Sequence, residues 1–173
     1  NGATRGWAKL LGFAAPIDRT GIQSDSDMAE TSIRSVGVIG AGQMGNGIAH
    51  VCALAGIPVR LNDVALDRIN AGLATINGLM ARQVAKNLIT EEGRKAALAR
   101  ITPAAGLDAL ADCDLVIETA TEKEDVKRRI FGDLCATLKP EAIIGTNTSS
   151  ISITRLAAST DRPERFIGIH FMN

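Results

Sequence analysis

A glycine-rich segment offers the clearest chemistry in this chain. Its residues are, in order, Gly40, Ala41, Gly42, Gln43, Met44 and Gly45, which follow the spacing G-x-G-x-x-G. An apolar run precedes the segment and residues at helical spacing follow it, as expected of a turn between a buried strand and a helix. In such a turn the first glycine permits the tight bend, the second lets a pyrophosphate approach the backbone, and the third lets the helix pack against the strand. Free N–H groups in the first turn of the helix then bind the phosphates.

The acidic residue that follows the second apolar run predicts which dinucleotide is bound. Asp63 comes 18 residues after Gly45, and its carboxylate can accept hydrogen bonds from a ribose 2′-hydroxyl while repelling a 2′-phosphate. This arrangement favours NAD over NADP. Arg60 is close enough in sequence to weaken that preference. The alternative interpretation is a glycine-rich turn beside an ordinary surface aspartate.

Two further side chains suit proton transfer at a substrate oxygen. His170 ends an apolar run, and its imidazole can accept a proton near neutral pH without large tuning. Ser149 follows another apolar run, and its hydroxyl can donate to a carbonyl oxygen on which charge develops. A lone histidine at a strand end is also compatible with a structural role. His50, inside the first helical segment, is expected to be structural.

The elements that must position these residues alternate along the chain. Apolar runs predict strands over 36–40, 59–61, 115–117, 142–145 and 166–170. Helical spacing predicts helices over 44–55, 69–84, 90–100, 126–138 and 151–158. The alternation indicates an α/β fold of Rossmann type, doubly wound, with a mainly parallel sheet and helices on both faces. Ligands of such sheets bind at the carboxyl ends of the strands, where the residues above are expected to meet.

Composition excludes several function classes. The 173 residues carry 19 Lys and Arg against 19 Asp and Glu, and only 3% are aromatic, which argues against nucleic-acid binding. No apolar stretch is long enough to span a bilayer. Three scattered cysteines without C-x-x-C spacing indicate a reducing, cytoplasmic setting. With only two histidines, no protein-bound metal is expected.

The first 32 residues differ from the rest of the chain. They mix Gly, Asp, Ser and Pro with one short apolar patch, and are expected to form a leader or linker that is poorly ordered. A targeting peptide is the alternative, although Lys9 interrupts the patch and no long apolar stretch follows. Residues 33–173 are expected to form one dinucleotide-binding domain.

Three segments together resemble a known family. They are G-V-I-G-A-G-Q-M-G at 37–45, T-N-T-S-S at 146–150 and R-F-I-G-I-H-F-M-N at 165–173. In order and spacing the chain from Ile33 to Asn173 resembles the 3-hydroxyacyl-CoA dehydrogenase family, and within it the bacterial 3-hydroxybutyryl-CoA dehydrogenases. Residues 1–27 carry no part of this resemblance.

The resemblance implies NAD-dependent oxidation of a short-chain (S)-3-hydroxyacyl-CoA to the 3-oxoacyl-CoA, and the reverse. His170 then matches the general base that takes the proton of the 3-hydroxyl. Ser149 matches a residue that contacts the substrate oxygen and the cofactor, and Asn173 one that lines the nicotinamide and substrate pocket. Three more positions follow from the same match: Glu122 and Lys127 near the cofactor, and Lys86 near a CoA phosphate.

The family pattern continues past the last residue of this chain. In the family a glutamate that orients the histidine comes after the segment matched by 165–173, and a helical domain completes the acyl-CoA pocket and forms a homodimer. The chain is therefore expected to be an N-terminal fragment that binds NADH and turns over acetoacetyl-CoA barely or not at all. Two alternatives are a non-catalytic NAD-binding module and a dehydrogenase of a non-CoA hydroxy acid such as L-gulonate.

Overall fold

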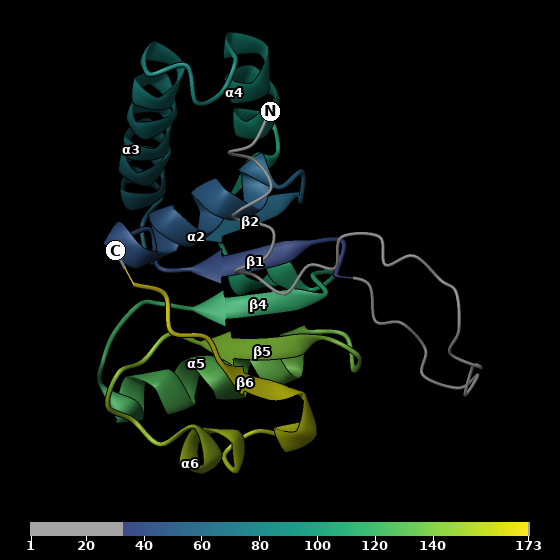
Figure 1. Ribbon diagram of the computed structural model, residues 1–173. Coiled ribbons are helices and arrows are strands. Elements are labelled where there is room, and N and C mark those ends of the chain that lie inside the picture. The colour runs from purple at the N-terminus through teal and green to yellow at the C-terminus, as the bar shows by residue number, and fades with distance from the viewer. Residues whose placement is uncertain (1–32, 173) are drawn as a thin grey trace, which may run out of the picture. The chain divides into compact units, whose positions relative to one another are not determined.

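A parallel six-stranded sheet forms the centre of the computed structural model, which describes residues 33–172 (Figure 1). The strands are β1 (Val36–Ile39), β2 (Val59–Asn62), β3 (Ile101–Ala104), β4 (Leu115–Glu118), β5 (Ile143–Thr146) and β6 (Phe166–Gly168). Their order in the sheet is β3-β2-β1-β4-β5-β6, and every neighbouring pair is parallel. This order is that of the dinucleotide-binding fold. The predicted Rossmann-type architecture is confirmed.

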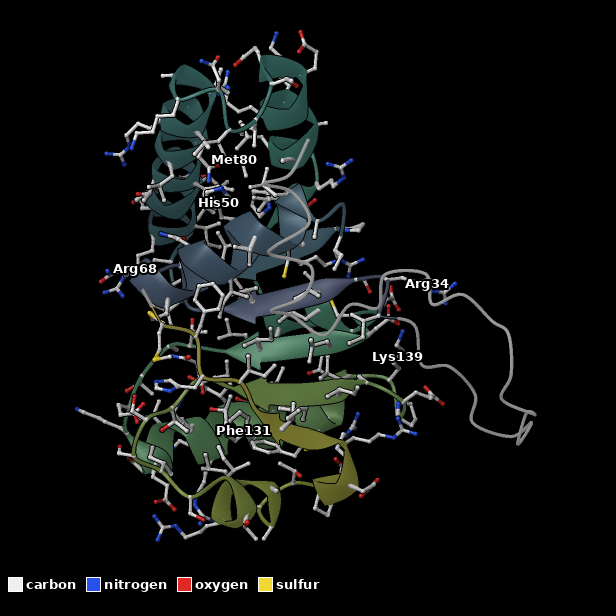
Figure 2. All side chains as sticks on the ribbon, in the orientation of Figure 1. Arg34, His50, Arg68, Met80, Phe131 and Lys139 are labelled. Carbon is white, nitrogen blue, oxygen red and sulfur yellow. The ribbon has the colours of Figure 1, made fainter. Side chains whose placement is uncertain are left out.

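Helices cover both faces of the sheet. They are α2 (Gln43–Leu54), α3 (Leu66–Ala85), α4 (Glu91–Leu98), α5 (Glu124–Thr137) and α6 (Ile153–Ala157), with short 3-10 turns at Leu107–Leu110 and Pro163–Arg165. Successive strand residues point to opposite faces, and β1, β3 and β4 each contribute to both of two separate hydrophobic clusters. Met80 of α3 belongs to one cluster and Phe131 of α5 to the other, on opposite sides of the sheet (Figure 2).

One strand was absent from the sequence-based expectation. β3 contains Pro103, and only its end residues Ile101 and Ala104 are buried, so it has little of the apolar pattern that marks a strand. It lies at the edge of the sheet and pairs only with β2. The amide of Val59 donates to the carbonyl of Arg100, and the alternation of backbone groups then directs the Pro103 nitrogen away from β2. A residue without an N–H group is tolerated there.

Several boundaries also differ from the prediction. β6 ends at Gly168, so His170 lies just beyond the strand rather than at its last position. α3 begins at Leu66, three residues before the predicted start at 69, and ends at Ala85, just before Lys86. Within the described range, no helix is both long and apolar enough to cross a membrane. The expected leader, residues 1–32, and Asn173 lie outside the described residues.

Candidate active site

The glycine segment forms the turn between β1 and α2. Gly40 has a φ of +100°, and a Cβ there would lie 2.9 Å from the Cα of Ala120. A Cβ at Gly45 would lie 1.7 Å from the carbonyl oxygen of Gly40, so only glycine lets α2 start so close to the strand. A Cβ at Gly42 would meet no protein atom within 4 Å, and no side chain caps the start of α2. The backbone at Gly42 is thus open to a ligand, as a pyrophosphate site requires.

Asp63 ties the end of β2 to this turn. Its Oδ2 accepts a hydrogen bond from the amide of Ala41 at 2.8 Å, and its Oδ1 accepts one from the amide of Val64 at 2.8 Å. The guanidinium of Arg60 donates to the carbonyl of Ala109. Arg60 is therefore held by the 3-10 turn Leu107–Leu110, while the exposed Arg68 lies 3.9 Å from the Asp63 carboxylate. The carboxylate remains the polar group at the place where the ribose of a bound dinucleotide lies in this fold.

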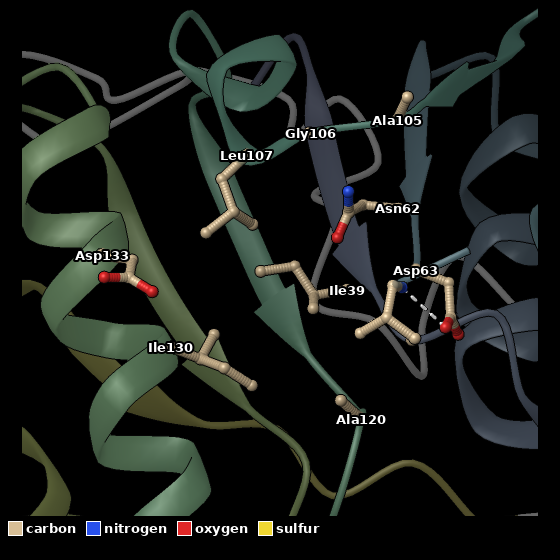
Figure 3. Close-up of a pocket in the computed structure, with 11 residues that line it drawn as sticks. Ile39, Asn62, Asp63, Ala105, Gly106, Leu107, Ala120, Ile130 and Asp133 are labelled. Carbon is tan, nitrogen blue, oxygen red and sulfur yellow. Dashed lines mark hydrogen bonds between the residues drawn. The ribbon is translucent and has the colours of Figure 1, made fainter. Parts of the chain in front are cut away.

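A cavity of about 290 Å³ opens beside Asp63 (Figure 3). Ile39 and Leu107 line it on one side, and Ile130 and Asp133 of α5 line it on the other. An apolar recess with a few polar groups at its rim is the usual form of a site for a flat heterocycle. Its position next to Asp63 suits the adenosine half of a dinucleotide.

Glu122 organises the loop that follows β5. One carboxylate oxygen, Oε1, accepts hydrogen bonds from the Thr148 hydroxyl, from the Ser149 amide at 3.0 Å, and from the Ser150 amide and hydroxyl at 3.2 and 2.9 Å. Burial opposes ionisation of Glu122, but these hydrogen bonds outweigh it and hold the pKa of the carboxyl below its ordinary value. The second oxygen, Oε2, takes no part in these contacts. Glu122 thus fixes Ser149 while keeping one oxygen for a ligand.

Ser149 and His170 meet at the carboxyl edge of the sheet. Ser149 Oγ and His170 Nε2 are 3.0 Å apart, and both residues are exposed. The backbone around His170 is held by β5, because the Ile169 amide donates to the Thr146 carbonyl at 2.9 Å and the Phe171 amide donates to Asn147 Oδ1 at 2.8 Å. A proton acceptor and a hydrogen-bond donor are thereby placed to contact one and the same substrate oxygen.

The two lysines lie elsewhere. Lys127 has no exposed surface, and its ammonium pairs with Glu118 at the end of β4. Lys86 is exposed and follows α3, whose 20 residues carry it about 30 Å from the carboxyl end of β2. The structure therefore brings the glycine turn, Asp63, Glu122, Ser149 and His170 to one sheet edge, with Lys127 buried beneath it and Lys86 remote.

Glu118 is the residue of this region that the sequence-based reasoning missed. It is fully buried although it is charged. Its signal was present in the sequence, because an acidic residue closes the apolar run 115–117 and a lysine follows on the charged segment of the next helix. A buried acid needs such a partner.

His50 fits the structural role expected for it. It is 8% exposed, and its Nε2 lies 3.0 Å from Gln83 Oε1, between α2 and α3 (Figure 2). Burial lowers the pKa of the imidazole more than the hydrogen bond to Gln83 raises it. Among residues 33–172, no group of three or more His, Cys, Asp or Glu side chains is arranged to hold a metal ion.

The chain is similar to known dehydrogenases. A 3-hydroxybutyryl-CoA dehydrogenase of Bradyrhizobium diazoefficiens is 72% identical over 141 residues, which cover 82% of this chain and 48% of that protein. One from Mycobacterium tuberculosis is 43% identical over 143 residues, or 82% of this chain and 50% of that protein. The crystal structure of (S)-3-hydroxybutyryl-CoA dehydrogenase from Ralstonia eutropha superposes with a TM-score of 0.81 at 46% identity, covering 82% of this chain and 50% of that one.

The chain thus spans about half the length of these relatives. Residues 35–173 match the family described as "3-hydroxyacyl-CoA dehydrogenase, NAD binding domain". This match bears out NAD as the cofactor expected from the glycine turn and Asp63. The chain belongs to the 3-hydroxyacyl-CoA dehydrogenase family, of which it carries the NAD-binding domain.

Proposed function

We propose that this chain is the cofactor-binding part of an enzyme that oxidises short-chain (S)-3-hydroxyacyl-CoA thioesters to 3-oxoacyl-CoA thioesters and catalyses the reverse reduction. The observation that carries the proposal is the 3.0 Å contact between Ser149 Oγ and His170 Nε2. It lies at the same sheet edge as the open glycine turn. A bound NAD supplies the hydride acceptor for the oxidation.

The side chains divide the remaining work. His170 Nε2 takes the proton of the substrate 3-hydroxyl as the oxygen becomes a carbonyl, and returns it in the reduction. The Ser149 hydroxyl donates to the same oxygen and stabilises charge that develops on it. The glycine turn and the start of α2 hold the pyrophosphate, and Asp63 accepts from the adenosine ribose. By the family resemblance, Glu122 and Asn173 would line the nicotinamide side, and Lys86, far from the sheet edge, would reach a phosphate of the CoA.

To act as a general base, His170 needs a hydrogen-bond partner for its second ring nitrogen. Its Nε2 faces Ser149, whereas its Nδ1 has no hydrogen-bond partner among the described residues. A general base of this type works when the second ring nitrogen is held, since that contact fixes the tautomer. The family resemblance assigns this role to a glutamate, and assigns dimerisation to a helical domain, in the half of the relatives that this chain does not span. We therefore expect the 173 residues to bind NADH and to reduce acetoacetyl-CoA barely or not at all.

The test measures binding and turnover separately. NADH binding to the 173-residue chain is followed by nucleotide fluorescence, and acetoacetyl-CoA reduction by loss of NADH absorbance. The second assay is repeated on a chain continued with the remaining half of the Bradyrhizobium relative. The proposal expects binding by both proteins and robust reduction only by the longer one. Robust reduction by the 173 residues alone would contradict the expected division of labour.

Substitutions in the longer protein then test the assigned roles. His170→Gln and Ser149→Ala are expected to lower kcat by a factor of about 10² or more while NADH affinity stays close to that of the unchanged protein. Lys86→Ala is expected to raise the KM for the CoA thioester alone. If His170→Gln retains full activity, His170 is not the general base and its role is structural. If 3-hydroxy acids without CoA are oxidised faster than the thioesters, the assignment of the substrate is wrong.

A further inference from the structure

A buried ion pair lies beneath the carboxyl edge and contacts both halves of the site. Glu118 ends β4 and Lys127 belongs to α5, and neither side chain has any exposed surface. We propose that this pair is a positioning device, which holds the glycine turn and the Ser149–His170 pair in fixed relation. The inference rests on the proposed function, because it concerns how that site is held in shape.

The ammonium of Lys127 meets three acceptors of the chain itself. A lysine ammonium carries three donors. In the structure they meet Glu118 Oε2, the Thr146 hydroxyl oxygen at 3.2 Å and the carbonyl oxygen of Asn147 at 3.2 Å. The acceptors lie at the end of β4 and at, or one residue after, the end of β5, so the ammonium ties these two strand ends together.

The carboxylate of Glu118 connects the pair to the glycine turn. Its Oε1 accepts a hydrogen bond from the amide of Ala120 at 2.8 Å. Ala120 is in turn the backbone neighbour that the glycine at position 40 accommodates, since a Cβ on Gly40 would lie 2.9 Å from the Ala120 Cα. The other oxygen, Oε2, accepts from Lys127 and from the Thr146 hydroxyl at 2.9 Å. One carboxylate thus links the segment beside the phosphate loop to the end of β5.

Asn147 carries the connection on to the catalytic pair. Lys127 holds its carbonyl, and its amide donates to the Glu118 carbonyl at 2.8 Å. Its side-chain Oδ1 accepts from the amide of Phe171 at 2.8 Å. Phe171 is the neighbour of His170, and Asn147 stands two residues before Ser149. Ser149 and His170, whose side chains lie 3.0 Å apart, are therefore both attached to backbone that the Glu118–Lys127 pair fixes.

Stability and positioning can be separated, because they respond differently to removal of one charge and of both. Deleting a single partner leaves an uncompensated charge in the interior, which is strongly destabilising, whereas replacing both charges by uncharged groups of similar size is often neutral. In Glu118→Gln/Lys127→Met the fold can recover, but no ammonium holds the Asn147 carbonyl. If the pair only stabilises the fold, the double variant should recover NADH binding and the position of His170 together with its stability.

The experiment compares four proteins built on the 173-residue chain: the unchanged chain, Lys127→Met, the double variant, and Arg129→Met as a control that removes an exposed cation from α5. Thermal unfolding, NADH affinity by fluorescence, and the ¹⁵N signal of His170 Nε2 by NMR are measured for each. We expect Lys127→Met to lower the Tm and the double variant to regain it. Both are expected to bind NADH about tenfold more weakly and to show a displaced His170 signal. The control should match the unchanged chain.

Two results would overturn the inference. A double variant that regains the Tm, the NADH affinity and the His170 signal together makes the pair structural only. A loss of NADH affinity in Lys127→Met with the Tm and the His170 signal unchanged makes Lys127 a direct cofactor contact. Should the double variant not fold, Thr146→Val removes the hydroxyl that bridges both charges and is read by the same signals. If the unchanged chain binds no NADH, the proposed function fails, and the His170 signal still decides the role of the pair.

Discussion

The second and third glycines of the phosphate loop offer a sharp test, because the structure predicts opposite consequences for the same added methyl group. At position 45 the new Cβ would lie 1.7 Å from the Gly40 carbonyl oxygen, where ordinary contact begins near 3.4 Å. α2 would have to move away from β1 by about the difference. At position 42 the new Cβ meets no protein atom within 4 Å, and the φ of −82° is one that alanine adopts without strain.

These distances translate into different energies. Forcing backbone apart in a packed region costs up to about 3 kcal/mol, so Gly45→Ala is expected to lower the Tm by about 10 °C in a domain of this size. Gly42→Ala is expected to change the free energy of unfolding by no more than about 0.5 kcal/mol. Its methyl group stands in the open space where a pyrophosphate approaches the backbone. NADH affinity should therefore fall by about tenfold or more, which corresponds to about 1.4 kcal/mol.

Thermal unfolding and fluorescence titration with NADH on the two variants and the unchanged chain provide the measurement. Gly42→Ala serves as the packing control for Gly45→Ala, and Gly45→Ala as the folding control for Gly42→Ala. A Gly42→Ala protein that binds NADH as well as the unchanged chain would refute the assignment of this turn to the pyrophosphate. An unaltered Tm in Gly45→Ala would refute the packing argument.

Three further changes test charged groups, two at the site and one, Asp114, at the opposite, amino end of the strands. Asp63→Asn is expected to weaken NADH binding more than NADPH binding, and an unchanged affinity ratio would remove Asp63 from cofactor selection. Glu122→Gln should weaken NADH binding at pH 7. The pKa of Glu122 in the folded state lies below its ordinary 4.5. The hydrogen bonds of its carboxylate to the loop therefore persist above pH 4.5 and are lost as the pH falls through the lowered pKa. Titrations of NADH binding down to pH 4 would begin to show this loss. Asp114→Asn should cost about 2 kcal/mol of unfolding free energy at pH 6. The hydrogen bond from Lys139, with those from the backbone at Arg34 and from Ser35, lowers the pKa of Asp114 from 3.8 to about 2. The unchanged chain should therefore lose this contribution to its stability between about pH 4 and 2. A difference in unfolding free energy between the unchanged chain and Asp114→Asn that stays constant across that range, measured by urea unfolding, would contradict the assignment.

The repeating part of the architecture could be predicted because its physical signals are local. Apolar runs followed by helical spacing marked five strands and five helices, and G-x-G-x-x-G with a later aspartate placed the cofactor edge. β3 was missed for an equally physical reason. An edge strand needs no continuous apolar run, and its Pro103 is a residue that normally argues against a strand.

The site was predictable in its members but not in their connections. His170 and Ser149 could be named from the sequence, whereas their 3.0 Å contact depends on how β5 and β6 pair. Lys127 shows the limit most clearly. On the charged segment 123–129 it looks like its solvent-facing neighbours, and only the packing of α5 on the sheet turns it inward to Glu118. Long-range pairing of buried charges leaves no periodic signal in a sequence.

The proline in β3 has a consequence for the free edge of the sheet. The outer side of an edge strand presents a row of unpaired amides and carbonyls. A strand of another molecule can pair with them, and native proteins obstruct such edges with proline. Pro103 directs a ring instead of an N–H group outward, in the middle of a strand of only four residues. A foreign strand would find one of its hydrogen bonds missing and its path blocked. Pro103, which made β3 hard to predict from the sequence, thus also protects this edge of the sheet from aggregation.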